Sequence, residues 1–289
     1  MRIIIMIFIS LISFNLTAWD KINYIGSDNI STGGAVAGEL GDIDNIIVNP
    51  ACILFKNDEL VKVKLSGSRL FSGFEQGLYN YSFAAAYNLK YVTPGIFYGA
   101  FTSDMYSESV LGISGSHKLA DNFIVGLSFI LEMNSFSLSE EDNDALFTGT
   151  SLEKSDWYFN PGIIYLVNET LSIGLYSSEF FGKNFNFNES ILGLGVENLM
   201  YENSKSVLNK IKLKLDIYTM GGTYQNYKAG IECYFFKNYL QVQLGYNRNN
   251  ISFGTGFTYK NYILNLAYLL YNNITDFGNT VKATIEVKF

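Results

Sequence analysis

From about residue 61 onward, apolar and polar residues alternate along the chain with a period of two. Residues 61–66 read Val-Lys-Val-Lys-Leu-Ser, residues 211–216 read Ile-Lys-Leu-Lys-Leu-Asp, and residues 281–286 read Val-Lys-Ala-Thr-Ile-Glu. Because successive side chains of a β-strand point to opposite faces, each segment has one apolar face and one polar or small face. The pattern predicts an all-β protein.

The alternation divides into fourteen predicted strands, most of them about 9 to 12 residues long. Tilted strands of that length cross a bilayer, whereas strands of soluble proteins usually have about 5 to 6 residues. The predicted strands span residues 61–71, 78–89, 92–102, 108–119, 122–134, 156–167, 170–178, 189–199, 210–219, 224–235, 239–246, 251–259, 262–270 and 280–289.

The connections between these strands alternate in length. Residues 90–91, 120–121 and 260–261 form very short turns, whereas residues 135–155 form a long loop. Short turns on one rim and long loops on the other are typical of outer-membrane barrels. The connection 200–209 is an exception, because it is long where a short turn is due. An even number of strands puts both termini on the short-turn rim, which is the periplasmic rim of such barrels.

A soluble β-sandwich also alternates, with its apolar face inward. Here Tyr and Phe residues cluster at the ends of the predicted strands, for example Tyr79, Tyr98, Tyr259 and Tyr262. Aromatic rings with a polar edge prefer the lipid–water interface. Because lipid offers no hydrogen bonds to an open sheet edge, such a sheet must close. We therefore predict a 14-stranded antiparallel transmembrane β-barrel over residues 58–289.

Two proline-glycine pairs, Pro94-Gly95 and Pro161-Gly162, fall inside or near predicted strands. Proline has no N–H to donate to a neighbouring strand, so each pair indicates a bulge or a kink. For Pro94 the alternative is an ordinary proline at the start of a strand.

The N-terminal residues follow a different pattern. Residues 1–18 combine a positive start, an apolar stretch of about ten residues and a final small residue, Ala18. This pattern predicts a signal peptide cleaved after Ala18, and the alternative is a single membrane anchor. Residues 19–57 do not alternate and are rich in small residues. We expect them to form a hatch that plugs the barrel lumen, and the alternative is a disordered periplasmic arm.

Composition removes several other classes of protein. The 289 residues are 16% aromatic and 16% charged, with 20 basic and 27 acidic residues and a net charge of −7. The aromatic content excludes a disordered chain, and the acidic balance argues against nucleic acid as a partner. The 2 cysteines cannot build a disulfide scaffold. After the signal peptide, no apolar stretch reaches the roughly 18 residues of a transmembrane helix.

Charged side chains on the predicted inner face are the first candidate site. By the phase of their strands, the residues expected to face the lumen are Arg69, Lys212, Lys214, Asp216, Glu232, Lys282, Glu286 and Lys288. Charge inside a barrel belongs either to a ligand pathway or to a network that ties a hatch to the wall. A carboxylate ligand would pair with Lys212 or Lys214, so both interpretations stay open.

The sequence gives little support for a catalytic site or a metal site. The single histidine, His117, follows Ser116, and adjacent residues of a strand point to opposite faces and cannot act together. The acidic residues Glu140, Glu141, Asp142 and Asp144 lie in the longest loop without the spacing of a calcium loop. We therefore predict no catalytic residue, no metal site and no cofactor, and we expect that the protein is not an enzyme.

Both ends of the chain resemble a known family. Gly33-Gly34-Ala35, an Asp/Asn cluster over residues 42–45, and Asn49-Pro50-Ala51 together resemble the N-terminal hatch of FadL-type outer-membrane proteins. That group includes long-chain fatty-acid transporters, the PorV- and PorQ-like proteins of type IX secretion, and spirochaete-type relatives. Residues 276–280, followed by a last strand ending in Phe289, are similar to the PorV-like pattern. A terminal aromatic residue is also similar to the signal read by the barrel-assembly machinery.

The resemblance implies a fourteen-stranded barrel and two kinds of function. Transporters of this group pass hydrophobic molecules past the hatch or sideways into the bilayer, and a kink in their third strand, near Pro94 and Gly95 here, can open a lateral gap. We therefore expect uptake of hydrophobic small molecules, such as long-chain fatty acids, through the outer membrane of a diderm bacterium. Membrane lipid and a hydrophobic ligand would be partners, and both termini would be periplasmic.

PorV-like relatives instead hold or shuttle secreted proteins. The alternative function is therefore a non-transport binding partner in protein secretion or surface assembly. An apolar pocket above the hatch would favour transport, and a lumen sealed by polar contacts would favour the partner role.

Overall fold

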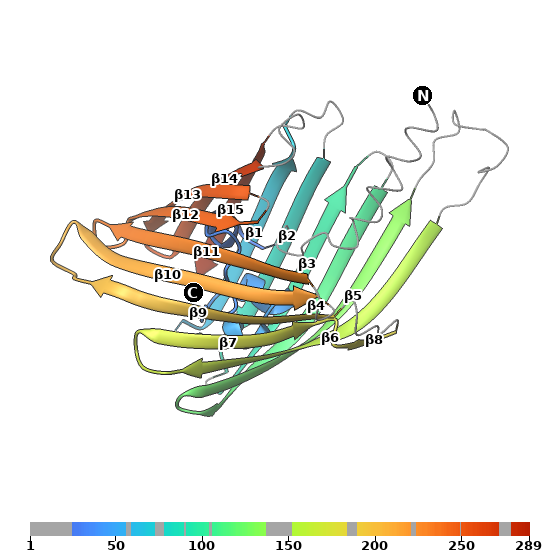
Figure 1. Ribbon diagram of the computed structural model, residues 1–289, viewed down its shortest axis with the longest axis horizontal. Coiled ribbons are helices and arrows are strands. Elements are labelled where there is room, and N and C mark those ends of the chain that lie inside the picture. The colour runs from blue at the N-terminus through green and yellow to red at the C-terminus, as the bar shows by residue number, and fades with distance from the viewer. Residues whose placement is uncertain are drawn as a thin grey trace.

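The computed structural model describes residues 25–55, 59–72, 78–89, 91–103, 106–136, 152–183, 190–220, 224–248, 250–271 and 279–289. These residues form one antiparallel sheet that closes around a short helical segment (Figure 1). The signal peptide, the loop acids Glu140, Glu141, Asp142 and Asp144, and most of the 276–280 motif lie outside the described residues.

The helical elements are short and precede the sheet. They are α2 (Ser27–Ser31) and the 3-10 helices η2 (Ile43–Ile47) and η3 (Pro50–Ile53). The strands are β1 (Val61–Leu70), β2 (Leu78–Tyr87), β3 (Val92–Thr102), β4 (Tyr106–Ala120), β5 (Phe123–Phe136), β6 (Leu152–Leu166), β7 (Leu171–Ser178), β8 (Phe181–Gly182), β9 (Ile191–Glu202), β10 (Leu208–Met220), β11 (Tyr224–Phe235), β12 (Leu240–Asn247), β13 (Asn250–Tyr259), β14 (Tyr262–Tyr271) and β15 (Thr280–Lys288).

Apart from β8, the strands pair in sequence order, with β7 between β6 and β9. Because β1 also pairs with β15 and β5 with β6, the sheet closes on itself. The two-residue strand β8 pairs with β6 beyond the end of β7. We therefore count β7 and β8 as one interrupted strand, which gives the closed 14-strand barrel that the alternation predicts. Closure by backbone pairing suits a lipid environment, because lipid offers no hydrogen bonds to an open sheet edge.

The two proline-glycine pairs behave differently. The pairing of β6 with β7 stops at Gly162, next to Pro161, and resumes with β8 at Phe159. The irregularity predicted at this pair is therefore confirmed. At Pro94 and Gly95, β3 and β4 keep their register through both residues, so there is no bulge in this ladder, and Pro94 lies near the start of β3 as the alternative expected. The pairing of β3 with β2 begins only at Gly95. Pro94 therefore lies outside the β2–β3 pairing, where its missing N–H leaves no hydrogen bond unmade.

The long connection predicted over residues 200–209 is also corrected. Strand β9 continues to Glu202 and β10 begins at Leu208, so the turn covers only residues 203–207. The extra strand residues pair across the sheet, as Glu202 does with Lys210, although they no longer alternate between apolar and polar. Both ladders of β10 shift register here, which is typical of a bulge near a rim.

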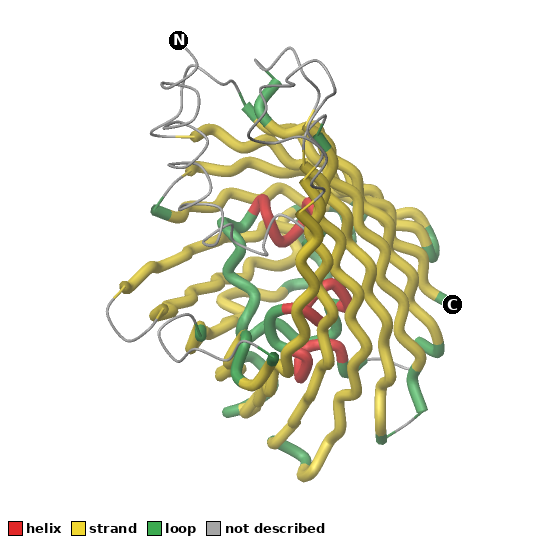
Figure 2. Tube along the Cα trace, turned by 90° about the vertical axis from the view of Figure 1, so that its right-hand side faces the viewer, coloured by secondary structure: helices red, strands yellow, loops and turns green. Residues whose placement is uncertain are grey.

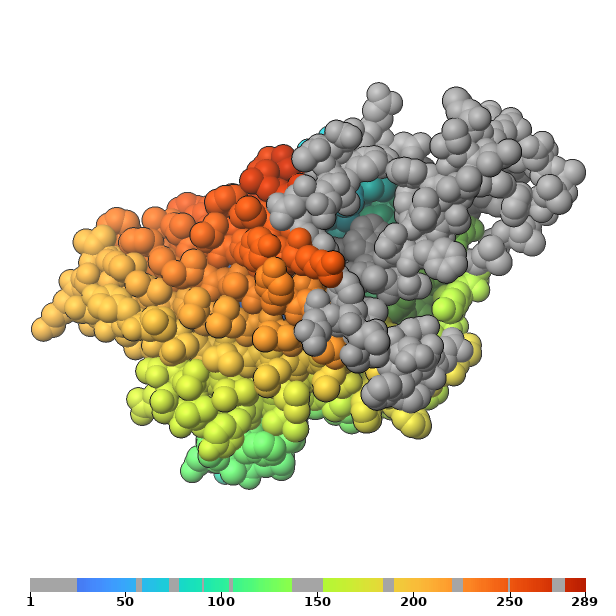
Figure 3. Space-filling model, in the orientation of Figure 1, coloured from blue at the N-terminus to red at the C-terminus, as the bar shows by residue number. Residues whose placement is uncertain are grey.

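The burial of the strands is inverted relative to a soluble protein. Lys64 is 1% exposed, whereas its neighbour Leu65 is 55% exposed, and Lys214 and Lys282 are also among the largest fully buried side chains. Figure 3 shows part of the outer surface, which β9–β14 present. An apolar outer face over a polar inner face is the pattern of a transmembrane barrel. Among the described residues, no helix is long and apolar enough to span a membrane.

Residues 25–55, which we term the luminal segment, lie inside the ring of strands (Figure 2). Their side chains are largely buried, and α2 packs against β12–β15 while η2 and η3 pack against β1–β6. Isoleucines of the luminal segment, including Ile25, Ile43 and Ile46, form one apolar cluster with inward side chains such as Phe97 and Val110. The core of the molecule is therefore the contact between this segment and the wall.

Candidate functional site: the barrel lumen

The path of the luminal segment is set by turns and caps that its sequence motifs provide. Gly33 and Gly34 adopt positive φ angles of 71° and 77°, a conformation that costs other residues energy. Asp42 caps η2 by accepting a hydrogen bond from the Asp44 N–H at 3.1 Å. Asn49 caps η3 in the same way from the Ala51 N–H at 3.2 Å, and Pro50 occupies the first helical position.

Three pairs of glycines on the inner wall receive this segment. Within each pair the two glycines lie directly opposite one another on neighbouring strands: Gly126 and Gly162 on β5 and β6, Gly174 and Gly195 on β7 and β9, and Gly230 and Gly245 on β11 and β12. A Cβ atom at these positions would collide with Asn49–Ala51 at the first pair, with Ala37 at the second and with Thr32–Gly33 at the third. The backbone of the luminal segment therefore rests directly on the wall at three points.

Lys64 of β1 is the centre of the first charge cluster. Its Nζ lies 2.9 Å from Asp28, 2.9 Å from Asp42 and 2.8 Å from Asp44, all in the luminal segment. Glu286 of β15 is more distant, at 3.9 Å. The three aspartates lie close enough together to hold a metal ion, but the Lys64 ammonium already supplies the positive charge between them. Because the lysine and most of these carboxylates are buried, the cluster ties the segment to β1.

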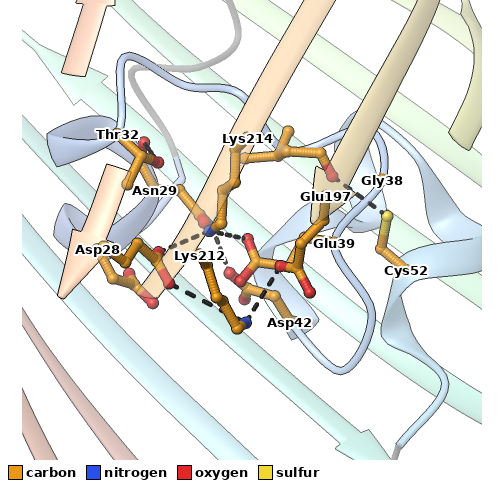
Figure 4. A network of polar contacts seen from close by, with 12 residues as sticks. Asp28, Asn29, Thr32, Gly38, Glu39, Asp42, Cys52, Glu197, Lys212 and Lys214 are labelled. Carbon is orange, nitrogen blue, oxygen red and sulfur yellow. Dashed lines mark hydrogen bonds and ion pairs between the residues drawn. The ribbon is translucent and has the colours of Figure 1, made fainter. Parts of the chain in front are cut away.

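The second cluster lies on β9–β11 (Figure 4). Lys214 Nζ lies 2.7 Å from Glu39 of the luminal segment and 2.7 Å from Glu232 of β11. Lys212 Nζ lies 3.1 Å from Glu197 and 4.0 Å from Glu232. These contacts link the luminal segment to three neighbouring strands.

Hydrogen bonds to backbone groups of the luminal segment complete the attachment. One oxygen of Asp216 accepts hydrogen bonds from the backbone N–H groups of Val36 at 2.8 Å and Ala37 at 2.9 Å. Ser172 donates to the Gly38 carbonyl at 2.6 Å. Asn160 donates to the Ile47 carbonyl at 2.9 Å and accepts from the Glu179 N–H, so it bridges the interruption between β7 and β8 as well.

Burial changes the ionisation of the acidic groups in the luminal segment. It raises the pKa of Glu39 to about 8, against the opposing charge of Lys214. It also raises the pKa of Asp44 to about 7, although Lys64 acts in the opposite direction. Burial would raise the pKa of Asp42 too, but the charge of Lys64 and the hydrogen bonds from Lys64 and Asn29 outweigh it, and this pKa falls to about 2. The Lys64 charge therefore keeps Asp42 ionised while Asp44 titrates near neutral pH.

The structure brings together most of the residues that the sequence singled out. Gly33, Gly34, Ala35, Asn49, Pro50 and Ala51 are all buried in the luminal segment. Of the predicted inward charges, Lys212, Lys214, Asp216, Glu232, Lys282, Glu286 and Lys288 lie on the inward phase of their strands. Arg69 does not, because it is exposed and shares the phase of the outward Leu65. The prediction for Arg69 is therefore wrong.

Sequence reasoning missed Lys62, Lys64 and Glu197 as members of this site. Lys62 and Lys64 occupy the polar phase of β1, which is the same signal that identified Lys212 and Lys214 on β10. Lys62 donates to the Gly41 carbonyl at 2.8 Å. The strand pattern could therefore have included both lysines, although it could not have named their partners.

Beyond the luminal segment, towards the rim that carries the long connections, one side of the inner wall is apolar. We term this set of side chains the apolar collar, and its members are Leu70, Phe71, Leu78, Phe101, Tyr106, Tyr158, Tyr176, Ile191, Leu269 and Tyr271. Its rings contact one another, as Phe71 does Tyr271 at 5.1 Å between centroids and Phe101 does Tyr106 at 5.9 Å. The collar is continuous with the isoleucines of the luminal segment.

The opposite side of the same rim, on β10–β13, is polar. Asn226 donates to the Tyr218 hydroxyl at 2.7 Å, and Lys228 lies 4.5 Å from the centroid of the Tyr218 ring. Asn247 and Asn250 follow on β12 and β13. At this rim the inner wall therefore has an apolar side and a polar side.

Ser116 and His117 lie on opposite faces of β4, and the two cysteines lie apart from one another among the described residues. Ser116 is buried and donates to the Ala51 carbonyl at 3.2 Å, whereas His117 Nδ1 lies 2.9 Å from the Tyr91 carbonyl at the other face of β4. Cys52 and Cys233 are free, and burial raises the pKa of the Cys52 thiol. Cys52 packs in the luminal segment, and Cys233 lies on the outward phase of β11 beside Ile231.

Comparisons with known proteins concern the fold alone. No family model matches the chain, and no curated protein matches its sequence. The toluene transporter TbuX of Ralstonia pickettii matches with a TM-score of 0.64 at 12% identity, over 93% of this chain and 99% of that one. The toluene transporter TodX of P. putida gives 0.65 at 13% identity over the same shares. A Pseudomonas aeruginosa FadL homologue gives 0.58 at 10% identity, over 91% of this chain and 98% of that one. This chain is therefore similar in fold to FadL-like barrels over most of its length.

Proposed function

We propose that this barrel takes up small hydrophobic molecules through the outer membrane of a diderm bacterium, with residues 25–55 acting as a hatch. Both termini would then be periplasmic, and the long connections would face outside. The observation that carries the proposal is the apolar collar, which lines the lumen between the long-loop rim and the luminal segment. A polar solute gains nothing from such a surface, whereas an apolar one is stabilised by leaving water.

The resemblance in fold supports the same interpretation. TbuX and TodX carry the description of toluene transporters, and a third barrel of this fold is described as a monoaromatic hydrocarbon channel. The hatch-like sequence motif adds the long-chain fatty-acid transporters as relatives by resemblance. We therefore propose hydrophobic compounds as the substrate class, with long-chain fatty acids and monoaromatic hydrocarbons as the two substrates to compare.

The hatch role rests on how the luminal segment is held. Buried ion pairs at Lys64 and Lys214 and backbone contact at the three glycine pairs would keep it in the lumen while no substrate passes. The lumen thus has an apolar wall above the segment and polar contacts around it. We attribute the polar contacts to holding the hatch, because each cluster joins the segment to the wall. In this proposal, Phe289 and the last strand would guide insertion by the barrel-assembly machinery.

Uptake by reconstituted protein tests the proposal. The purified full-length protein would be placed in liposomes, and entry of a labelled long-chain fatty acid and of labelled toluene would be compared with empty liposomes. Replacing Leu269 of the collar by Asn should slow uptake about tenfold, because a buried leucine contributes on the order of 1.5 kcal/mol to apolar contact. The neighbouring Leu270 faces outward and gives a matched control, Leu270→Asn, which should leave uptake unchanged.

A heat-modifiable shift in gel mobility would verify that each variant is folded. Uptake no faster than in empty liposomes, by folded protein and for both substrates, would overturn the transport proposal and leave the secretion-partner role. Equal slowing by Leu269→Asn and Leu270→Asn would show that the collar is not on the route.

A further inference from the structure

A row of buried polar side chains crosses the inner wall on β15, β1 and β2, which are neighbours in the sheet (Figure 1). Ser68 of β1 lies opposite Lys282 of β15 on one side and opposite Asn80 of β2 on the other. Side chains in such positions have Cβ atoms about 4.5 to 5.5 Å apart. We term Lys282, Ser68 and Asn80 the polar row. Their exposed fractions are 1%, 7% and 1%, so the three share one enclosed part of the wall.

Two members of the polar row have unused hydrogen-bonding atoms. Among the described residues, neither the Ser68 hydroxyl nor the Asn80 side-chain oxygen has a hydrogen-bond partner. Buried polar groups in folded proteins nearly always have a partner, and leaving one unpaired costs free energy. A hydroxyl and a side-chain amide can both donate hydrogen bonds to a ligand. The polar row therefore indicates a place where a ligand supplies the polar atoms that the fold does not.

Lys282 determines the charge of such a ligand. A fully buried ammonium is costly in free energy unless negative charge compensates it. The aspartates Asp28 and Asp44 of the luminal segment are near enough for their charges to act on Lys282, but both pair directly with Lys64. An ammonium beside a hydroxyl and an amide offers several donors in one place, and this combination suits a carboxylate.

The apolar collar adjoins the polar row on the side of the long-loop rim. The next inward residue after Ser68 on β1 is Leu70 of the collar. Two other collar residues, Leu78 and Phe101, flank Asn80, the first on β2 itself and the second directly opposite on β3. A ligand that places its carboxylate on the polar row can therefore lay an apolar group on the collar.

We propose that the polar row binds the carboxylate of a hydrophobic molecule whose apolar part lies on the apolar collar. Lys282 pairs with the carboxylate, and Ser68 and Asn80 donate hydrogen bonds to it. This inference rests on the proposed function, because it takes the collar as the surface that receives the transported molecule. It goes further in that these three residues select hydrophobic carboxylates over hydrocarbons of the same size.

Equilibrium dialysis of the purified full-length protein at pH 7 tests the polar row without requiring transport. The labelled ligands are phenylacetate, toluene and acetate, and detergent alone gives the background. Phenylacetate combines the aromatic ring of toluene with the carboxylate of acetate. It should bind at least about tenfold more tightly than either, because a hydrogen bond to a charged group contributes on the order of 1.4 kcal/mol or more.

Variants of the polar row should lose this preference. K282M and the double variant S68A/N80L should each lower the preference for phenylacetate over toluene at least about tenfold. S68A/N80L removes atoms that have no partner in the fold, so its folded stability should be unchanged or higher, which separates a binding role from a structural one. The matched controls are K260M, in an exposed turn, and S107A, on the outward phase of β4, and both should keep the preference.

Equal affinity of the unaltered protein for phenylacetate and toluene would overturn the inference, as would an unchanged preference in K282M and S68A/N80L. Acetate bound as tightly as phenylacetate would overturn it in favour of a site for a small free anion. Retained phenylacetate binding by a protein that fails to take up any substrate into liposomes would overturn the proposed function and support this site. The heat-modifiable mobility shift would verify folding, and were K282M unfolded, S68A/N80L would be judged by the same criterion.

Discussion

At the scale of single residues, glycine decides where the wall and the luminal segment can touch. A Cβ atom at Gly174 would collide with the carbonyl oxygen of Ala37, and one at Gly245 would collide with the N–H of Gly33. Both obstacles are backbone atoms, so no side-chain rotation relieves them. Gly67 lies on the outward phase of β1, and a Cβ there would meet nothing within 4 Å. Glycine is therefore required on the inner face, where the luminal segment touches the wall, and is not required at Gly67 on the outer face.

We expect Gly174→Ala to push Ala37 away from the wall and to destabilise the folded barrel. Overpacking of a closely fitted site costs about 1 to 3 kcal/mol in free energy of unfolding. The measurement is urea unfolding in detergent, with protease cleavage within residues 25–55 as a second readout of segment release.

Gly67→Ala is the control for this substitution. Both glycines lie inside strands, so both variants gain the same restriction of the unfolded chain. Gly67→Ala should leave the free energy of unfolding unchanged or slightly raised. If both variants lost equal stability, the contact between Ala37 and the wall would not be the cause.

Residue phase explains what the sequence could and could not predict about the charges. Lys212 and Lys214 alternate with apolar residues on both sides, which marks their inward face without ambiguity. Arg69 ends the run Ser-Gly-Ser-Arg, which has no apolar residue to indicate which face of the strand each position occupies. Its side chain faces outward. The three aspartate partners of Lys64 lie 20 to 36 residues away in sequence, in a segment without alternation, so only the folded chain reveals that cluster.

At the scale of elements, strands were more predictable than the segment they enclose. The predicted third and tenth strands, 92–102 and 224–235, match β3 and β11 residue for residue. Alternation also fails where cross-strand pairing extends a strand beyond its apolar residues, as at Glu202. The caps at Asp42 and Asn49 are visible in the sequence, but the route of residues 32–38 depends on glycines that several strands contribute. No local pattern encodes that route.

The ionisation of Glu39 gives the luminal segment a pH dependence. The pKa of Glu39 rises from an ordinary 4.5 to about 8 in the folded protein. Between these values the folded state holds a proton that the unfolded state has lost, so folded stability falls as the pH rises through this window. Asp44, with a pKa of about 7, acts in the same direction. Asp42, with a pKa of about 2, loses its contribution only in strong acid.

We therefore expect the free energy of unfolding to decrease between about pH 4.5 and pH 8, by no more than about 1.4 kcal/mol per pH unit for each group. Urea unfolding across this range would measure the slope. Glu39→Gln removes the titrating group and should flatten the slope, whereas Glu169→Gln, in an exposed turn, should leave it as it is. A Glu39→Gln variant with an unaltered slope would show that Glu39 does not carry the effect.

At the scale of the whole molecule, the inverted burial pattern requires a solvent that is itself apolar. Buried lysines inside and exposed leucines outside would be unstable in water, since the outer face would aggregate. A closed sheet with polar contacts in its lumen and an apolar outer face is a stable arrangement only if hydrocarbon covers that outer face. This conclusion depends on where along the barrel an outward residue lies, because the apolar layer of a bilayer is limited in depth.

Placing arginine on the outer face at two depths tests this directly. Leu215 is exposed in the middle of β10, opposite Val196 and Ala229, whereas Leu119 is exposed beside the short turn that ends β4. In lipid vesicles, Leu215→Arg should cost about 2 to 4 kcal/mol in free energy of unfolding, and Leu119→Arg only about 0 to 1. In water both substitutions would relieve apolar exposure equally, so equal effects in vesicles would contradict a transmembrane position. The cost in free energy of unfolding depends steeply on depth only if the arginine of Leu215→Arg must enter hydrocarbon.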